Sequence, residues 1–491
     1  MPRHVRTALV VLALLSHANP AAAQAPPDTT KWPSQFAEID RYAEALLRAD
    51  RAPGASVALV YRDRLVHVYS IGVDQRGRAI TGSTSFVLGS MSKSITALAV
   101  MQLVERGQIV LDAPARTYLP AFRIASPDSG ATITVRQLLL HTSGLPHAVS
   151  RGPRRTLRER IDALRTVRPL RAPGSAHAYA SPNYLVLGAI VEAVSGQSFA
   201  QYVEQHIFAP LGMHDSFTDR AQALSHGFAG GHVYAFGMPV ASSLEAEADR
   251  LPTAALMSSA ADLARVLAMF LRQGRVDGGQ FLDAATVRQI QTGGAASDGF
   301  SYAFGWREGR INGVRAVHHG GIVPDFRGKM VMLPESGWGV VVLTNVSSAI
   351  PWPVTPTSHR LADDIAARLV GQPLPPPETR HRMTFALIAA GMGVLLLAQL
   401  RTLLREGRAA RRRLHDAGSS RRAWRATAID ALVLIGIALL PRLVSLTWGD
   451  LLKGAPDLAW WLVAMASMGM MTMACRLVRL TRRPAVGHAT A

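Results

Sequence analysis

Cysteine is nearly absent from this chain of 491 residues, which contains only Cys475. A single cysteine excludes an intramolecular disulfide, a zinc site built from cysteines and a thiol redox pair. The sequence also shows no His/Asp/Glu cluster with the spacing of a metal site and no glycine-rich phosphate loop. We therefore expect a fold that is stable without covalent cross-links, which a chain of this length allows, and a function that needs no cofactor.

Acidic residues are also scarce, since 34 aspartates and glutamates stand against 53 lysines and arginines, a formal net charge of +19. Such an excess can mark a protein that binds nucleic acid. Its location argues otherwise, because residues 1–23 and 380–491 hold 19 of the basic residues but only 5 of the acidic ones, which leaves a net charge of +5 for residues 24–379. The positive charge belongs to the two ends of the chain, and we expect no nucleic-acid partner.

The first 23 residues have the pattern of a secretory signal peptide. Arg3 and Arg6 precede an apolar stretch at 8–15, and three alanines at 21–23 form a cleavage site of small residues. The apolar stretch is too short to span a bilayer comfortably, which favours cleavage over the alternative of an uncleaved anchor. The part of the chain that follows is therefore expected outside the cytoplasm.

Three apolar runs of 18 residues each occur near the C-terminus, at Met383–Leu400, Ile429–Leu446 and Leu458–Cys475. As helices they would each be about 27 Å long at ~1.5 Å per residue, close to the roughly 30 Å of a hydrocarbon core. The second run is weaker, because Asp430, Pro441 and Arg442 fall within it. It is expected to cross the membrane, with a helix that only skims the interface as the alternative.

The distribution of arginine predicts the orientation of these runs. Residues 401–427 contain nine arginines and the tail 476–491 contains four, whereas the short segment 447–457 has only Lys453. Because basic segments stay in the cytoplasm, the loop 401–427 and the tail are expected inside and the globular part outside. This agrees with the signal peptide. We expect a multi-pass protein of the cell (inner) membrane, with the lipid bilayer as a partner and a periplasmic or otherwise extracytoplasmic globular domain.

The globular domain is expected at 24–370, joined by a proline-rich linker at 371–382 to the membrane segment 383–475. Apolar spacing predicts helices at Phe36–Arg48, from Ser90 to about Arg106, at Tyr184–Val194 and at Thr357–Leu369. β-Rich runs predict a hairpin at Ala55–Tyr61 and Leu65–Ile71, and strands at Ala316–His318, Val331–Leu333 and Gly339–Thr344, the last one central. Strands at both ends around a helical middle predict an α/β fold with two lobes.

The string Ser90-Met91-Ser92-Lys93 is a candidate for catalysis. Residues three apart on a helix share one face, and a helix N-terminus stabilises negative charge. A lysine beside a serine hydroxyl lowers the cost of forming the alkoxide, or accepts the proton when the amine is neutral. Taken alone, the pattern also fits an N-cap serine followed by a solvated lysine.

The residues around this string resemble those of a known superfamily. The segment Ser85–Pro114 resembles the nucleophile region of the serine β-lactamases and penicillin-binding proteins, in particular the branch of class C β-lactamases, D-aminopeptidases and related esterases. Further stretches resemble that branch in the same order: Thr134–Pro146, Pro173–Met213, Ala255–Phe270, Phe304–Trp306 and His319–Phe326. The resemblance covers roughly residues 35–370. It implies a β-lactamase-like two-lobe fold, with an antiparallel sheet flanked by helices plus a helical lobe, and Ser90 as the nucleophile paired with Lys93.

The resemblance also implies a role for Tyr179, which stands where this branch has the tyrosine of a Tyr-x-Asn motif. A phenol near the lysine can act as the general base toward the serine and then return the proton to the leaving group. Here the motif ends in Ser181, which keeps a hydrogen-bonding group but loses the reach and the two donors of the amide. Asn183 matches a common non-catalytic position. The departure at Ser181 affects substrate positioning, above all for β-lactam amides.

The third motif of the family is Lys-Thr-Gly in β-lactamases and often His-x-Gly in esterases and peptidases. Counting back from Pro324–Phe326 makes His319 the expected motif residue, with His318 as the alternative. An imidazole there can polarise the site or hydrogen-bond a carbonyl or carboxylate of the substrate. Without the lysine, this motif provides no permanent cation for a substrate carboxylate, which argues against a dedicated β-lactamase.

Two further positions follow from the resemblance. Gly321 permits close approach of the backbone, and the N–H of Ile322 is implied to form an oxyanion hole together with the N–H of Ser90. His141 is implied to hold the wall of the site and not to take part in catalysis. Asp325 replaces the usual glycine of the family, and the sequence gives no reason for it.

The implied reaction is acyl-transfer hydrolysis through a Ser90 acyl-enzyme, with Lys93 and Tyr179 as the base system. Short esters, amides or D-amino-acid peptides are the expected small-molecule or peptide substrates. One alternative is a D,D-carboxypeptidase or β-lactamase that acts on cell-wall peptides or β-lactams. Another is a non-catalytic membrane sensor or binding protein with a degenerate hydrolase domain, which the serine at 181 and the three membrane runs motivate.

Overall fold

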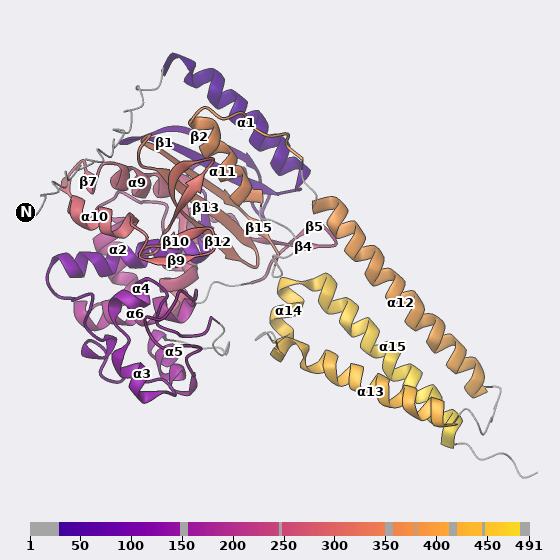
Figure 1. The fold of residues 1–491 in the computed structure, drawn as a ribbon. Helices are drawn as coiled ribbons and strands as arrows, with labels where there is room; N and C mark the ends of the chain where they lie inside the picture. The colour runs from indigo at the N-terminus through magenta and orange to yellow at the C-terminus, as the bar shows by residue number, and fades with distance from the viewer. Residues whose placement is uncertain are drawn as a thin grey trace, which may run out of the picture.

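A computed structural model describes residues 29–147, 156–244, 248–348, 357–378, 381–411, 420–443 and 447–481. The predicted signal peptide at 1–23 and most of the tail lie outside these ranges. The described chain forms a mixed α/β body with two lobes, from which three long helices extend (Figure 1).

An antiparallel sheet of eight strands forms the centre of one lobe, in the order β2-β1-β14-β13-β12-β11-β10-β9. The strands are β1 (Gly54–Tyr61), β2 (Arg64–Gly72), β9 (Ala295–Ser297), β10 (Phe300–Tyr302), β11 (Arg307–Ile311), β12 (Val314–Val323), β13 (Phe326–Leu333) and β14 (Trp338–Thr344). Every residue of β13 and β14 is buried, as expected for strands covered on both faces. The predicted hairpin and the predicted central strand are both confirmed.

Helices cover both faces of this sheet. Val340 and Val342 of β14 join the core formed with α1 (Trp32–Ala49) and α11 (Thr357–Leu369). Their neighbours Val341 and Leu343 join the core formed with α2 (Ser92–Glu105) and α9 (Ala260–Leu271). Because successive side chains of a strand point to opposite faces, one apolar run supplies both cores.

The second lobe is mainly helical and packs around α2, which is buried from Ser92 to Leu103. Its helices are α3 (Pro127–Thr132), α4 (Val135–Leu139), α5 (Leu157–Asp162), α6 (Ser181–Ser195) and α7 (Phe199–Val203), while α8 (Arg220–His226) precedes β4 and α10 (Ala284–Gln291) precedes β9. A helix that is buried on all sides lies between two layers, and α2 accordingly joins the sheet to this lobe.

Short strands complete the globular part. These are β3 (Ser85–Val87) paired with β6 (Met257–Ser259), β7 (Arg275–Val276) paired with β8 (Gly279–Gln280), and a sheet of β15 (Val346–Ser347), β4 (His232–Ala235) and β5 (Met238–Ala241). Residues 372–378 then form no helix or strand.

The C-terminal helices are α12 (His381–Arg411), α13 (Ser420–Leu443), the short α14 (Trp448–Gly454) and α15 (Pro456–Thr481). Three of them are long and apolar enough to cross a membrane, over Arg382–Arg411, Arg421–Leu443 and Pro456–Thr481. They contain the three predicted runs, apart from residues 444–446, which lie outside the described ranges. Arg476 of α15 forms ion pairs with Glu406 of α12 and Asp430 of α13, so one buried arginine connects all three helices.

Candidate active site

Ser90 lies in a 3-10 turn (Gly89–Met91) that leads directly into α2. The α-helix predicted to begin at Ser90 begins two residues later, at Ser92. The side chain is half-buried. Gly89 has a φ of +56°, and a Cβ on it would come 2.7 Å from the backbone nitrogen of Ile322. Only glycine combines this φ with so close an approach. The turn that carries Ser90 is thereby held against β12.

Lys93 follows on the first turn of α2 and is fully buried, with 0% of its side chain exposed. Its Nζ donates to Ser90 Oγ at 3.2 Å and to the carbonyl of Thr253 at 2.9 Å. The same Nζ lies 5.1 Å from the ring centre of Tyr179 and 5.9 Å from that of Tyr184. The lysine is therefore directed at the serine hydroxyl and enclosed by aromatic rings.

Tyr179 reaches the site from the segment just before α6. Its hydroxyl is buried and has no hydrogen-bond partner among the described residues. Buried hydroxyl groups are normally paired, so a phenol left free beside Lys93 is available to a reacting group. The structure thus brings Ser90, Lys93 and Tyr179 together, as the resemblance implied.

His141 fixes the segment that carries Tyr179. Its ring lies 4.3 Å from the ring of Tyr179, and its Nδ1 accepts from the backbone N–H of Ala180 at 3.1 Å and bonds Asn183 Nδ2 at 3.0 Å. Burial, followed by the charge of Lys93, holds the pKa of His141 well below its usual range. His141 thus packs against the ring of Tyr179 and holds the backbone at Ala180.

Asn183 does not replace the missing amide of the Tyr-x-Asn motif. Its Oδ1 accepts from Ser143 Oγ at 2.6 Å and its Nδ2 bonds His141, so both ends of the amide are occupied. Ser181 is half-buried at the first position of α6. The third position of the motif is therefore occupied by Ser181 alone, without an amide.

The two histidines of the third motif lie on opposite faces of β12. His319 pairs with Met330, which belongs to the core around α2, whereas His318 pairs with Val331 in the core against α11. The ring of His319 lies 6.4 Å from that of Tyr179. His319 is thus the histidine on the side of the site, in agreement with the preferred register.

Both nitrogens of His319 are already occupied. Nδ1 lies 2.8 Å from the carbonyl of Gly320, so it must donate, which leaves Nε2 to accept from the hydroxyl of Tyr302 at 3.0 Å. Burial, followed by the charges of Arg307 and Lys93, holds the pKa of His319 well below its usual range. The expected hydrogen bond from His319 to a substrate would require Tyr302 to move away.

The backbone at the end of β12 approaches the serine turn closely. A Cβ on Gly321 would come 1.9 Å from the carbonyl oxygen of Leu88, and the nitrogen of Ile322 lies beside Gly89. This places the N–H of Ile322 and that of Ser90 on neighbouring segments. Two such donors suit an anionic oxygen.

Replacing Gly321 with alanine is therefore expected to push β12 away from the serine turn. We expect kcat/KM to fall about 10²-fold, the effect of an ~1 Å misplacement, together with a lower Tm. Gly278→Ala is the matched control, because a Cβ there meets nothing within 4 Å. Steady-state kinetics and thermal unfolding test this, and an unchanged kcat/KM in Gly321→Ala would show that the close approach has no catalytic importance.

The site also contains a cation that the sequence did not predict. Arg307, the first residue of β11, places its guanidinium carbon 5.9 Å from the ring centre of Tyr179 and 4.8 Å from that of Phe300. It is half-buried, its Nε has no hydrogen-bond partner among the described residues, and it forms no ion pair there. Arginine keeps its charge at all ordinary pH values. The site therefore contains the permanent cation that a histidine in the third motif does not provide.

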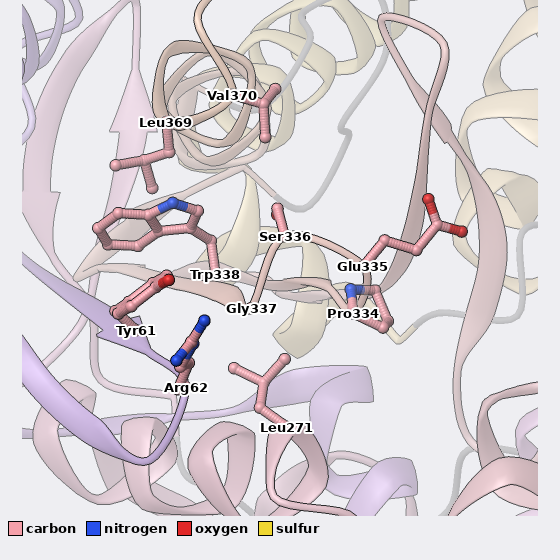
Figure 2. A pocket seen from close by; sticks show the side chains of 10 residues that line it. All are labelled: Tyr61, Arg62, Leu271, Pro334, Glu335, Ser336, Gly337, Trp338, Leu369 and Val370. Atoms are coloured by element: carbon pink, nitrogen blue, oxygen red, sulfur yellow. The ribbon is translucent and has the colours of Figure 1, made fainter. Parts of the chain in front are cut away.

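A surface hollow of about 520 Å³ lies elsewhere (Figure 2). Its lining comes from the β1–β2 turn, the β13–β14 turn and the ends of α9 and α11: Tyr61, Arg62, Leu271, Pro334, Glu335, Ser336, Gly337, Trp338, Leu369 and Val370. A Cβ on Gly328 of β13 would come 2.7 Å from Cε of Met91, the neighbour of Ser90. Pro334, which follows the end of β13, is six residues from Gly328, or about 20 Å at ~3.3 Å per residue. The hollow has no lysine or histidine beside its serine and offers no activated nucleophile.

Comparisons of the sequence give one family. Residues 39–362 match the Beta-lactamase family. Penicillin-binding protein 4 of Amycolatopsis lactamdurans is 31% identical over 381 residues, which cover 74% of this chain and 97% of that protein. Protein flp of Staphylococcus aureus is 28% identical over 320 residues, which are 63% of this chain and 63% of the relative.

Solved structures show the same fold. An octameric penicillin-binding protein homologue from Pyrococcus abyssi has a TM-score of 0.59 at 24% identity, covering 71% of this chain and 80% of that one. D-alanine carboxypeptidase AmpC from Burkholderia cenocepacia has a TM-score of 0.58 at 22% identity, covering 69% of this chain and 99% of that one. The described domain therefore has the fold of these two proteins, and the chain belongs to the Beta-lactamase family, within the superfamily of serine β-lactamases and penicillin-binding proteins.

Proposed function

We propose that this protein is a membrane-anchored, extracytoplasmic serine hydrolase that acts through an acyl-enzyme on Ser90. The observation that carries the proposal is the contact of 3.2 Å between Lys93 Nζ and Ser90 Oγ, with the unpaired hydroxyl of Tyr179 beside it. A buried amine and a free phenol around one serine form an activated nucleophile. No group of three or more His, Cys, Asp or Glu residues in the described ranges could hold a metal ion, and the proposed reaction uses none.

In acylation, the base system of Lys93 and Tyr179 takes the proton of the Ser90 hydroxyl while Oγ attacks the carbonyl carbon of the substrate. The carbonyl oxygen becomes an oxyanion, which the N–H groups of Ser90 and Ile322 stabilise. The proton then passes to the leaving alcohol or amine, and the bond between the carbonyl carbon and that group breaks. In the second half, water gives a proton to the base system while its oxygen attacks the carbonyl carbon. The bond to Ser90 Oγ then breaks, and the base system returns the proton to Oγ.

The substrates proposed are short esters, amides or D-amino-acid peptides that carry a carboxylate. Arg307 motivates the carboxylate, because a half-buried guanidinium without an ion-pair partner is free to bind one in a bidentate manner. The same observation favours a D,D-carboxypeptidase or a β-lactamase as the second candidate. Fluorescent penicillin separates these two, since a stable adduct indicates a peptidase-like site and rapid turnover a β-lactamase.

Arg307→Ala is expected to weaken binding of carboxylated substrates selectively. Loss of one hydrogen bond to a charged group costs about 1.5–3 kcal/mol, which corresponds to an increase in KM of roughly 10- to 150-fold. A neutral ester of the same acyl group is expected to change little. Parallel kinetics on the acid and its methyl ester test this, and an equal loss on both substrates would assign Arg307 to the structure of the site.

The anchoring part of the proposal rests on the three candidate spans and the arginine-rich segments between and after them. Trp461 Nε1 on α15 donates to the carbonyl of Met392 on α12 at 3.0 Å, and the ion pairs of Arg476 connect the same helices to α13. In hydrocarbon, polar side chains are placed where they pair with one another. These contacts support a three-helix bundle within one membrane.

A fluorophosphonate probe tests the proposed nucleophile on the full chain in detergent or nanodiscs. We expect covalent labelling of the wild type at Ser90 and none in Ser90→Ala. Equal labelling of the two would show that another residue is the nucleophile. A correctly folded wild type that neither labels nor turns over a panel of esters and D-peptides would favour the sensor or binding protein.

A further inference from the structure

The hairpin of β4 and β5 presents apolar side chains to the outside of the domain. Phe236, Met238 and Val240 are 53%, 51% and 46% exposed. Met238 and Val240 lie two apart on β5 and therefore on one face, and β5 is the last strand of its sheet. Neighbouring apolar side chains that stay exposed often mark a surface for a membrane or a partner.

The turn of this hairpin has an uncommon residue. Phe236 and Gly237 both have positive φ, 49° and 74°, as in the type I′ turns that favour Asn-Gly. A phenylalanine at this φ is strained. The residue is 53% exposed, so packing inside the domain does little to offset this strain.

The hairpin lies at the outer end of the candidate membrane spans (Figure 1). The N–H of Phe236 donates to Asp457 Oδ2 at 3.0 Å, and Asp457 is in the first turn of α15. The ring of Tyr234 lies 5.5 Å from the ring of Phe385, near the start of α12. The tip therefore stands at the level where two of the proposed spans begin.

Cationic and aromatic groups lie around the tip of the hairpin, where the proposed spans begin. Arg51 donates to the carbonyl of Gly237 at 3.5 Å, and Arg382 at the start of α12 donates to the carbonyl of Ala49 at 2.9 Å. Trp460, on the second turn of α15, is exposed. Arginine and tryptophan are the residues that the boundary between headgroups and acyl chains favours.

We propose that the tip of the β4–β5 hairpin, with Phe236, Met238 and Val240, inserts into the headgroup boundary of the outer leaflet and fixes the orientation of the hydrolase domain on the membrane. Apolar side chains of elements that lie on a membrane reach roughly 5–10 Å into this boundary. The inference rests on the proposed anchoring and adds a contact that the helices alone do not make.

The β4–β5 hairpin is also connected to the active site through its contacts with Asp325. At the base of the hairpin, the N–H of His232 donates to the carbonyl of Asp325 at 3.3 Å, and a Cβ on Gly231 would clash with the Asp325 side chain. Asp325 lies in the turn after β12, three residues from Ile322. Membrane contact at the tip would thus be connected to the strand end that holds the proposed oxyanion donor.

A fluorophore placed at the tip tests the inference on the full chain. Cys475, the only cysteine, is first replaced in Cys475→Ser, and an environment-sensitive NBD label is then attached to Phe236→Cys. The protein is reconstituted in vesicles of phosphatidylcholine and phosphatidylglycerol that carry a doxyl quencher near the headgroup. We expect blue-shifted emission and strong quenching at position 236.

Two matched positions keep the outcomes distinct. Val394→Cys, 64% exposed in the middle of α12, reports on the proposed span, and Val110→Cys, 59% exposed after α2, reports on the domain surface. Quenching at 394 by a deep doxyl lipid, without quenching at 236, overturns the inference about the hairpin but still supports the proposed membrane anchoring. No quenching at either position overturns both. Blue-shifted emission at 236 without quenching would mean that protein covers the tip, which also contradicts the inference.

Discussion

Lys93→Met is expected to lower kcat/KM by roughly 10²- to 10⁴-fold, the range for loss of an acid–base group. Methionine has a similar length and no charge, so it fills the buried space of Lys93 but cannot accept or hold a proton. The only polar atoms that Lys93 contacts among the described residues are Ser90 Oγ and the carbonyl of Thr253. The carbonyl left without a donor costs about 1–3 kcal/mol of stability, which thermal unfolding will show.

Lys329→Met is the matched control for this variant. Lys329 is also buried, but its Nζ binds both oxygens of Asp363, at 2.6 and 2.7 Å, on the α11 side of the sheet. Its loss leaves a carboxylate without its partner and is expected to reduce stability with little effect on kcat/KM. If Lys93→Met and Lys329→Met lost activity only in proportion to stability, Lys93 would have no catalytic role.

Tyr179→Phe is expected to lower kcat by about 10²- to 10⁴-fold while Tm stays unchanged. The substitution removes only the hydroxyl, and that hydroxyl has no hydrogen-bond partner among the described residues. The ring contact with His141 at 4.3 Å remains in phenylalanine. A large loss of activity without loss of stability is the signature of a group that acts on the substrate.

Tyr302→Phe is the matched control for Tyr179→Phe, and we expect it to affect stability more than activity. The hydroxyl of Tyr302 donates to Nε2 of the buried His319, so its removal leaves that nitrogen unpaired. We expect a loss of about 1–3 kcal/mol in stability and a smaller effect on kcat than in Tyr179→Phe. Kinetics and thermal unfolding of both variants test the assignment, and a fully active Tyr179→Phe would remove Tyr179 from the mechanism.

The sequence predicted most of the lobe architecture because the main elements carry strong local signals. The buried run at Trp338–Thr344 and the apolar face of Thr357–Leu369 are examples whose type and position the structure confirms. Ser90 and Tyr179 are 89 residues apart, and no spacing rule brings them together. Their neighbourhood was expected only through the ordered resemblance to known hydrolases.

The position of Arg307 beside Tyr179 could not be predicted from the sequence. It directly follows Trp306, the last residue of a matched stretch, but its contact with Tyr179 depends on the pairing of Tyr302 with Arg307 across β10 and β11. The hydrogen bond at Nε2 of His319 likewise depends on the hydroxyl of Tyr302. Side-chain contacts across strands follow from register, which residue patterns do not specify at this length.

The contacts of Asp325 also could not be predicted from the sequence, and only the structure shows them. Its carboxyl is buried beside Gly231, with a hydrogen bond from Ser242 and the charge of Arg220 nearby. Burial raises its pKa to about 6. The residue connects the turn after β12 to the β4–β5 hairpin, a contact between segments far apart in the chain.

The most direct test of the central claim is mass spectrometry of the full chain quenched during turnover of a carboxylated ester. The account predicts a transient increase in mass equal to the acyl group, located by proteolysis on the peptide that contains Ser90 and absent from Ser90→Ala. Turnover that persists in Ser90→Ala, or an acyl group found on any other residue, would contradict it.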